Sequence, residues 1–349
     1  MLYKNYSNSI KYLNDNACSA ILLRLNRDIL YRPVNVRKYK EEIIKDKKVK
    51  TALSWQNSDG YFGTSFHGGW LPENKRIASS KAMETALRML AEMGFDASDN
   101  FINKGLKSLL RDNFNRSWTS WDIYAPEYGL YGDDYERALL FAYFGIENKE
   151  FITREINRAI FNMKKLADLD DINDIFYIKS NINYYVKNKA LPDIYQLRLL
   201  AYTYSWRTDN NIAIINKAIQ KLIAFSPIPD IYINYKGQRI APAKILKFDF
   251  KKKFKNFTDN EWYEFFTTFE LFGKLGVLSI NNILKDYVDE LVDYINKTDG
   301  LFITQLKHKR FTVWGSYSGL MLEEKWTKKN RVCDLTFRSL GIIKYTYDD

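Results

Sequence analysis

The carboxylate-rich string Asp168-Leu-Asp-Asp171 is one place in the sequence where spacing could support acid chemistry. Carboxyl groups this close raise one another's pKa, and a carboxyl group that stays protonated can act as a general acid. The string is therefore a candidate for acid chemistry. The plainer interpretation is solvated charge capping a helix, because the chain has 42 Asp and Glu residues.

A second segment, residues 118–134, mixes aromatic rings with carboxylates. Its candidate ligand-binding rings are Trp118, Trp121 and Tyr124, and its candidate catalytic acids are Asp122 and Asp133. Aromatic rings with a few carboxylates are typical of a pocket for a sugar, a cation or a polyene. Alternatively, the rings fill a core and an acid of this segment caps a helix.

Residues 62–70 form the most unusual short stretch. His67 lies between aromatic residues and is followed by Gly68-Gly69 and Trp70. Glycines let a backbone approach a ligand closely, so His67 and Trp70 are candidate ligand-binding residues. The alternative is a structural loop in which the imidazole bonds a carbonyl group.

Helical periodicity recurs along the chain and would position these side chains. Five segments have apolar residues at helical spacing after Ser or Asp: 79–94, 134–145, 193–206, 259–276 and the segment from 334 onward. Second amphipathic segments follow four of them, at 99–110, 150–166, 211–225 and 279–296, and residues 9–31 and 41–54 are a further pair. Helix pairs that cannot bury both faces alone must stack on their neighbours.

Stacked pairs of this number favour a closed ring. The first helices are richer in aromatic and small residues and are expected as an inner ring, with the more polar second helices outside. The last helix has no following partner, which predicts closure against the N-terminal segment. We therefore expect an all-α fold: a single domain over residues 1–349, an α/α toroid (barrel) of about five to six helix pairs. A small β-hairpin is expected in an insert at residues 231–240, around Lys236-Gly237.

Polar residues of the predicted inner helices form another candidate set: Glu84, Arg137, Arg198, Glu270 and Arg338. Several lie at a similar distance from a helix start, so they could converge on a ligand at one mouth of the ring. Buried charges must be paired, so the alternative is an Arg–Glu network that joins neighbouring repeats. An acidic pair such as Glu84 with Asp133 could instead do acid–base work.

The segment Trp55-Gln-Asn-Ser-Asp-Gly-Tyr-Phe-Gly63 resembles the Q-x-x-x-G-x-[FW] repeats of the squalene-cyclase and protein-prenyltransferase superfamily. Gln56, Gly60 and Phe62 fit the spacing, and Lys297-Thr-Asp-Gly-Leu-Phe302 is a degenerate echo. In that family the Gln and an aromatic residue stabilise the turn, and Asp-Gly reverses the chain. Trp314-Gly315 looks like one of the family's late repeat units, which makes Trp314 a candidate ligand-binding residue.

The resemblance implies an α/α toroid with an aromatic-lined central pocket for a small or hydrophobic, isoprenoid-like ligand, in a cyclase or a transferase. Class II terpene cyclases use a D-x-D-D motif, and Asp170 would then be the protonating acid. Prenyltransferases hold zinc through Asp, Cys and His. Here Cys333 adjoins Asp334, but His67 and His308 have no zinc-site spacing, so no metal or cofactor is expected.

Two other function classes stay open. One is a carbohydrate-active α/α-barrel hydrolase or lyase that uses paired carboxylates such as Asp122 and Asp133. The other is a non-catalytic protein that uses the ring to bind a partner.

The net charge of +11 invites a nucleic-acid interpretation, and residues 247–255 alternate Lys with Phe. Nucleic acid is nevertheless disfavoured as a partner, because no known nucleic-acid-binding module is present. No apolar stretch has the length of a membrane span, and the start lacks the apolar core of a signal peptide. Two cysteines, Cys18 and Cys333, make no disulfide framework, so a cytoplasmic protein is expected. The expected partner is a small-molecule ligand or substrate.

Overall fold

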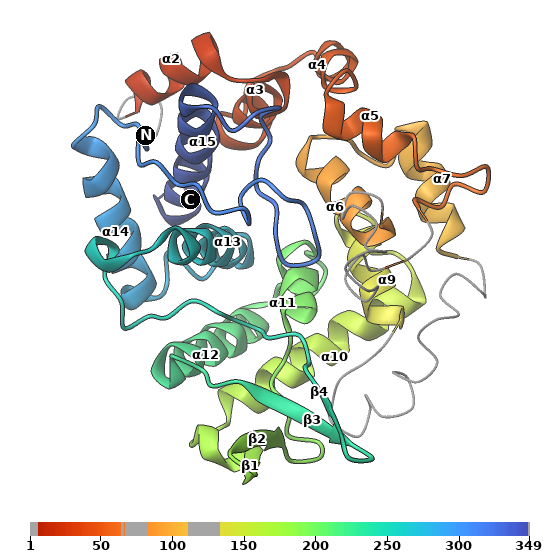
Figure 1. The fold of residues 1–349 in the computed structure, drawn as a ribbon, viewed down its shortest axis with the longest axis vertical. Coiled ribbons are helices and arrows are strands. Elements are labelled where there is room, and N and C mark those ends of the chain that lie inside the picture. The colour runs from red at the N-terminus through yellow and green to blue at the C-terminus, as the bar shows by residue number, and fades with distance from the viewer. Residues whose placement is uncertain (1–5, 64–65, 67–81, 111–132, 348–349) are drawn as a thin grey trace. The chain divides into compact units, whose positions relative to one another are not determined.

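The computed structural model describes residues 6–63, 66, 82–110 and 133–347. These residues form 13 α-helices and a four-stranded sheet (Figure 1). The predicted helix-rich class is confirmed, although the sheet is larger than the single hairpin that the sequence predicts. None of the described helices has the length and apolar character needed to cross a membrane.

Two compact units make up the chain. Unit 1 comprises Met1–Phe114, Thr258–Phe266 and Asn282–Asp349, and unit 2 comprises Asn115–Phe257 and Thr267–Asn281. Helix α13 (Asp259–Leu275) contributes residues to both units. The single domain over residues 1–349 stays a prediction.

Unit 1 contains the N-terminal helices, the first predicted repeat and the C-terminal helices. Its helices are α2 (Ser7–Asn16), α3 (Ser19–Arg24), the π-helical turn η1 (Leu25–Ile29), α4 (Val36–Ile43), α5 (Lys47–Leu53), α6 (Met83–Glu92), α7 (Asn100–Ser108), α14 (Asn282–Asn296) and α15 (Lys328–Tyr347). The helix predicted over residues 9–31 is therefore broken between α2 and α3. The break is held from outside, because a carboxylate oxygen of Glu323 accepts a hydrogen bond from the Cys18 amide at 2.8 Å.

Helix α15 also begins earlier than predicted, at Lys328 instead of Asp334. The Thr327 hydroxyl accepts a hydrogen bond from the Asn330 amide at 3.3 Å, which is the geometry of a helix cap. Asp334 lies inside the helix, buried, and accepts from the amides of Leu322 and Glu323. Its carboxylate therefore serves a tertiary contact and not the start of its own helix.

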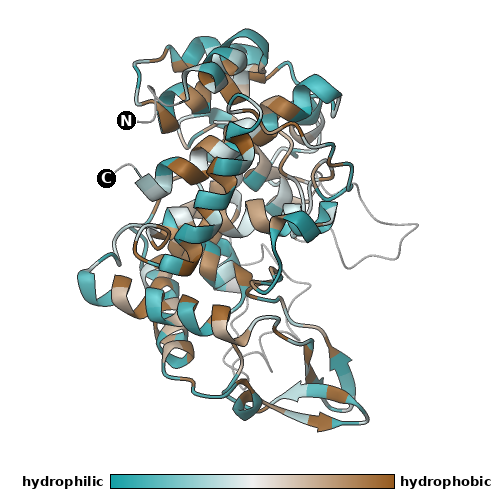
Figure 2. Ribbon diagram, turned by 90° about the vertical axis from the view of Figure 1, so that its left-hand side faces the viewer, coloured by the Kyte–Doolittle hydropathy of each residue, from teal (hydrophilic) through white to brown (hydrophobic). Residues whose placement is uncertain are grey.

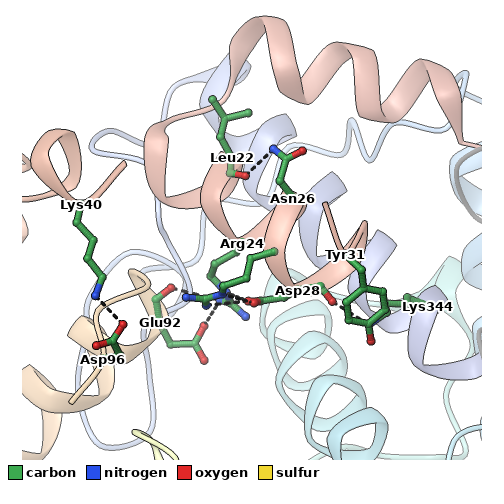
Figure 3. Close-up of polar contacts among 10 residues, drawn as sticks. Leu22, Arg24, Asn26, Asp28, Tyr31, Lys40, Glu92, Asp96 and Lys344 are labelled. Carbon is green, nitrogen blue, oxygen red and sulfur yellow. Dashed lines mark hydrogen bonds and ion pairs between the residues drawn. The ribbon is translucent and has the colours of Figure 1, made fainter. Parts of the chain in front are cut away.

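The C-terminal helix α15 packs against the N-terminal part of unit 1. It contacts α2, α3 and η1, as well as α14 (Figure 1). The Lys344 ammonium donates to the carbonyl oxygen of Asp28 at 2.8 Å and to the Tyr31 hydroxyl (Figure 3). Within unit 1, the predicted packing of the last helix on the N-terminal segment is therefore confirmed.

Burial separates the predicted first helices from the second helices. Helix α6 buries every residue from Met83 to Leu90, and α15 buries every residue from Arg331 to Leu340. The second helices α7 and α14 instead bury one stripe each, at helical spacing. Figure 2 shows helices on which hydrophobic and hydrophilic residues alternate, the pattern of a half-buried helix. The first helices are therefore packed on all sides and the second helices on one.

Unit 2 continues the same alternation and adds the sheet. Its helices are α9 (Asp133–Ala142), α10 (Glu150–Ala167), α11 (Ile194–Ala201) and α12 (Asp209–Phe225), with short 3-10 turns at Ile172–Ile175 and Phe254–Asn256. Helix α10 contacts α9, α11 and α12, and α9 contacts α11. Helix α11 buries all residues from Tyr195 to Ala201, whereas α12 buries one stripe.

The sheet joins two hairpins, and its strands run in the order β1-β2-β3-β4. The strands are β1 (Phe176–Lys179), β2 (Ile182–Tyr185), β3 (Ile231–Tyr235) and β4 (Gln238–Ile240). Strands β2 and β3 pair in parallel and the outer pairs are antiparallel. The predicted hairpin is confirmed as β3–β4, with positive φ at both Lys236 and Gly237. The β1–β2 hairpin, which turns at Ser180-Asn181 with positive φ at both residues, was not predicted.

Candidate functional site

The Q-x-x-x-G-x-F segment is a turn that follows α5 and is clamped onto α7. The Gln56 amide donates hydrogen bonds to the carbonyl oxygens of Gly60, at 2.8 Å, and of Phe101, at 2.7 Å. Gly60 has φ of +91°, and a Cβ there would lie 2.4 Å from the carbonyl oxygen of Lys104. Phe62 is fully buried beneath the turn. Gln56, Gly60 and Phe62 are therefore structural residues that fix one repeat to the next helix.

The related segment at residues 297–302 forms an equivalent turn after α14. Asp299 and Gly300 both have positive φ, and the carbonyl oxygen of Gly300 accepts from the Ser9 hydroxyl on α2 at 2.8 Å. Phe302 is fully buried, and its amide donates to the Thr336 hydroxyl on α15 at 3.0 Å. Both turns thus end a second helix, bury a Phe two residues after Gly, and press the Gly backbone onto another helix.

Helix α6 brings Glu84 beside the segment that carries Trp314. The Ser316 hydroxyl donates to Glu84 Oε2 at 2.7 Å, and Glu84 is 1% exposed. Arg88, one turn along α6, donates to the carbonyl oxygens of Gly315, at 2.7 Å, and Ser318, and its guanidinium lies 5.1 Å from the Trp314 ring centroid. Two predicted ligand-binding residues, 230 positions apart in numbering, therefore belong to one cluster.

The segment after Trp314 is held from its other side by Arg310, which the sequence did not single out. The Arg310 guanidinium pairs with Glu264, donates to Asn260 Oδ1 at 2.9 Å, and lies 4.2 Å from the Tyr263 ring centroid. It also donates to the carbonyl oxygen of Tyr317 at 3.0 Å. The loop that presents Trp314 is thus anchored by two arginines.

Unit 2 contains a buried acid among tyrosines at the start of α11. Asp193 Oδ1 accepts from the amides of Tyr195 and Gln196, at 3.0 Å each, which confirms its predicted role as a helix cap. Its other oxygen accepts from the Tyr135 hydroxyl at 3.1 Å. Burial, with the nearby Glu136 carboxylate, raises the pKa of Asp193 to about 6. Asp193 thus joins the start of α11 to Tyr135 of α9 through a buried carboxyl group.

The remaining described candidates of unit 2 lie on α9 and α11. Arg137 forms an ion pair with Asp134, and its guanidinium lies 4.3 Å from the Phe151 ring centroid. Arg198 is buried, 5.8 Å from the Tyr195 ring centroid. The Arg137 pair lies within α9 and joins no neighbouring repeat, so the Arg–Glu network stays a prediction at this residue. Asp133 is the first residue of α9, and its predicted partner Asp122 lies outside the described residues. The paired-carboxylate hypothesis therefore stays a prediction.

The acidic string before the sheet does not have the surroundings of a protonating acid. The Asp170 side chain is 95% exposed and pairs with Lys221 at 3.2 Å. Asp168 accepts from Lys164 and Lys217, and these hydrogen bonds lower its pKa. Asp171 caps a 3-10 turn through the amide of Asn173. Lysine neighbours favour the anion, so the geometry agrees with the solvated-cap interpretation.

Several predicted site residues lie outside the described part of the chain: His67, Trp70, Trp118, Trp121, Asp122 and Tyr124. Phe66, the residue before His67, is described and buried, and its carbonyl oxygen accepts from the Glu84 amide at 3.2 Å.

Two buried acids, Glu323 and Asp334, connect the break between α2 and α3 to the segment before α15. Asp334 accepts from the amides of Leu322, at 2.8 Å, and Glu323, at 3.0 Å. Burial raises the pKa of Asp334 to about 6 and, together with the Asp334 charge, that of Glu323 to about 7. Burial also raises the pKa of both free cysteines, Cys18 and Cys333. Among the described residues, no group of three His, Cys, Asp or Glu side chains could hold a metal ion.

The raised pKa of Glu323 makes the free energy of unfolding depend on pH. The pKa of Glu323 is higher in the folded chain than its ordinary value, so its stabilising contribution is present at low pH and is lost as pH rises through about 7. Glu323→Gln removes that titration. From about pH 5 to about pH 8, the unfolding free energy of the wild type should fall relative to that of Glu323→Gln by on the order of 2 kcal/mol.

Urea denaturation at several pH values measures this difference. Glu324→Gln, at the neighbouring exposed residue, is the control. A difference between the wild type and Glu323→Gln that stays flat over the whole range would contradict the buried-acid assignment.

No protein-family model, curated protein or solved structure matches this chain.

Proposed function

We propose that this chain is a squalene-cyclase-like α/α-toroid protein that binds a small, largely apolar ligand of the isoprenoid class. The observation that carries the proposal is the equivalence of the turns at Gly60 and Gly300. Each turn follows a second helix, and each presses a glycine onto another helix. A repeated turn of this kind is the feature on which the resemblance to that superfamily rests.

The packing of the chain ends supports a ring. Helix α15 is buried on all sides, as the first helices are, and it contacts α2. In this proposal α2 is the second helix of the pair that α15 begins. The Gly300 turn then bears on α2 as the Gly60 turn bears on α7, and the helix pairs follow one another around a closed toroid.

The ligand is expected at the starts of the first helices, where aromatic rings and buried acids lie together. In unit 1 these are Glu84 and Trp314, joined through Ser316. In unit 2 they are Asp193 and the rings of Tyr135 and Tyr195, which meet edge to face at 5.8 Å between centroids. Aromatic faces bind apolar ligands and stabilise cations.

Binding is tested with farnesol as the isoprenoid probe, followed by tryptophan fluorescence. Trp314→Phe and Ser316→Ala should each weaken farnesol binding roughly three- to tenfold, because each disturbs the cluster around Glu84. Val313→Ala is the matched control, since Val313 adjoins Trp314 but is 50% exposed.

Two outcomes would count against the proposal. One is the absence of farnesol binding by the wild type. The other is equal weakening by Val313→Ala and Trp314→Phe, which would place the ligand away from the Glu84 cluster.

A further inference from the structure

One face of the four-stranded sheet carries a row of tyrosines. The strand register places Tyr177 opposite Tyr184, and Tyr184 beside Tyr232, so the three side chains share one face. Asn234 and its partner Arg239 continue that face across β3 and β4. The opposite face contains the buried Tyr185, Ile231 and Ile233 and the exposed Ile178, and Tyr184 is itself buried. We call the residues Tyr177, Tyr184, Tyr232, Asn234 and Arg239 the tyrosine face.

Two flat side-chain groups, the Tyr177 ring and the Arg239 guanidinium, lie over other tyrosine rings of this face. The Tyr177 ring stacks on the Tyr184 ring, with 5.8 Å between centroids and 29° between planes, and its hydroxyl accepts from the Asn234 amide at 3.5 Å. The Arg239 guanidinium lies 5.1 Å from the Tyr232 ring centroid. Tyr177 is 42% exposed, and Arg239 is exposed as well. The sheet therefore presents an aromatic plane and a guanidinium plane, the two kinds of plane on which nucleobases stack.

The segment that builds β3 and β4 is basic. Residues 226–257 contain eight Lys and Arg against two Asp, which supplies +6 of the net charge of +11. One of these acids, Asp230, already pairs with Lys244. Residues 172–192, which build β1 and β2, contain three Lys against one Asp, and the acidic string Asp168–Asp171 directly precedes them. Positive charge in a segment that also carries stacking planes fits a polyanion with flat groups.

The alternating Lys–Phe run supports the same partner, in a way that the sequence did not predict. Its phenylalanines Phe248, Phe250 and Phe254 are buried, and the rings of Phe248 and Phe250 pack on Phe269 of α13. The lysines of the run are exposed: Lys247, Lys251, Lys252, Lys253 and Lys255. Because the apolar rings face inward, this run offers charge and no membrane-inserting side chain.

We infer that the tyrosine face, with the exposed lysines of the segment that builds β3 and β4, binds single-stranded nucleic acid, with bases stacked on Tyr177 and Arg239 and phosphates against the lysines. The absence of a recognisable module disfavoured this partner at the level of sequence; the row of tyrosines in register is the additional observation. The inference is independent of the proposed isoprenoid site, which uses other residues.

The test is fluorescence anisotropy of a labelled oligo-dT strand with the full chain at about 50 mM and about 200 mM salt. We expect binding that weakens steeply with salt, and roughly tenfold weaker binding for Tyr177→Ala and for Arg239→Ala. Tyr177→Phe should bind as the wild type does, because it keeps the ring. Tyr204→Ala is the matched control, since Tyr204 is an exposed tyrosine of the same unit, 68% exposed, under the guanidinium of Arg207.

Each contrary result overturns the inference. These results are no binding of the strand at the lower salt concentration, equal loss with Tyr177→Ala and Tyr204→Ala, and equal affinity for duplex DNA, whose bases cannot stack on a protein surface. Binding to vesicles of anionic lipid without binding to the strand would assign the surface to a membrane instead. In all of these cases the farnesol experiment still reports on the proposed function separately.

Discussion

Replacing Gly60 with alanine is expected to lower the free energy of unfolding by about 3–5 kcal/mol. The backbone at Gly60 has φ of +91°, which an L side chain rarely adopts. The added Cβ would also lie 2.4 Å from the Lys104 carbonyl oxygen, a backbone atom that cannot move without displacing α7. Urea denaturation of the full chain measures the loss.

Gly145→Ala separates backbone strain from close packing. Gly145 also has positive φ, +71°, but a Cβ there would meet no described atom within 4 Å. Strain alone should cost about 1–2 kcal/mol. If both alanine variants lose the same stability, the turn at Gly60 is not pressed against α7, and the equivalence with the Gly300 turn loses its basis.

Glu92→Ala should destabilise the protein by about 3–5 kcal/mol, because it removes one partner of a largely buried ionic network that includes the buried Arg338. The Glu92 carboxylate accepts from Arg24 of α3 at 2.6 Å (Figure 3). It also lies 3.9 Å from the guanidinium of Arg338 of α15. The Arg338 side chain is 1% exposed, so it cannot recover the lost charge contact from water. The network joins α3, α6 and α15 of unit 1. The sequence predicts such a network as one alternative to a ligand site for the polar residues of the first helices.

The control for Glu92 is an exposed ion pair in the same unit. Glu41 pairs with Arg37 one turn away on α4, and their side chains are 59% and 88% exposed. Glu41→Ala should change stability by less than about 0.5 kcal/mol. Equal effects of the two substitutions on the urea midpoint would contradict the assignment of Glu92 to a buried network.

Apolar periodicity identified most helices because it depends on local sequence. Helices α9, α10, α12, α13 and α14 begin and end close to the predicted residues, and Lys236-Gly237 marked the β3–β4 turn. Helix α11 begins as predicted but ends at Ala201, before the predicted end at residue 206. The β1–β2 hairpin was missed for a local reason, because its strands have four residues each and its turn, Ser180-Asn181, has no glycine. The start of α15 was missed for a tertiary reason, since Asp334 looked like a cap but serves the amides before its helix.

The candidate site depended more on tertiary structure. Glu84 and Trp314 were predicted separately, and nothing in their spacing indicates that Ser316 and Arg88 join them. Asp170 matched an acid motif, but its exposure follows from its place between α10 and the sheet, which the motif does not encode. The raised pKa of Asp193 has the same origin, because burial is set by the packing of α9 against α11.

The central claim is that the chain holds a small apolar ligand, and native mass spectrometry of the full chain purified from its own source tests it most directly. We predict a complex heavier than the chain, whose extra mass is released on denaturation as a hydrocarbon-rich compound of the isoprenoid class. The same preparation of Trp314→Phe should show less of the complex. A bare chain mass that farnesol does not shift would contradict the claim.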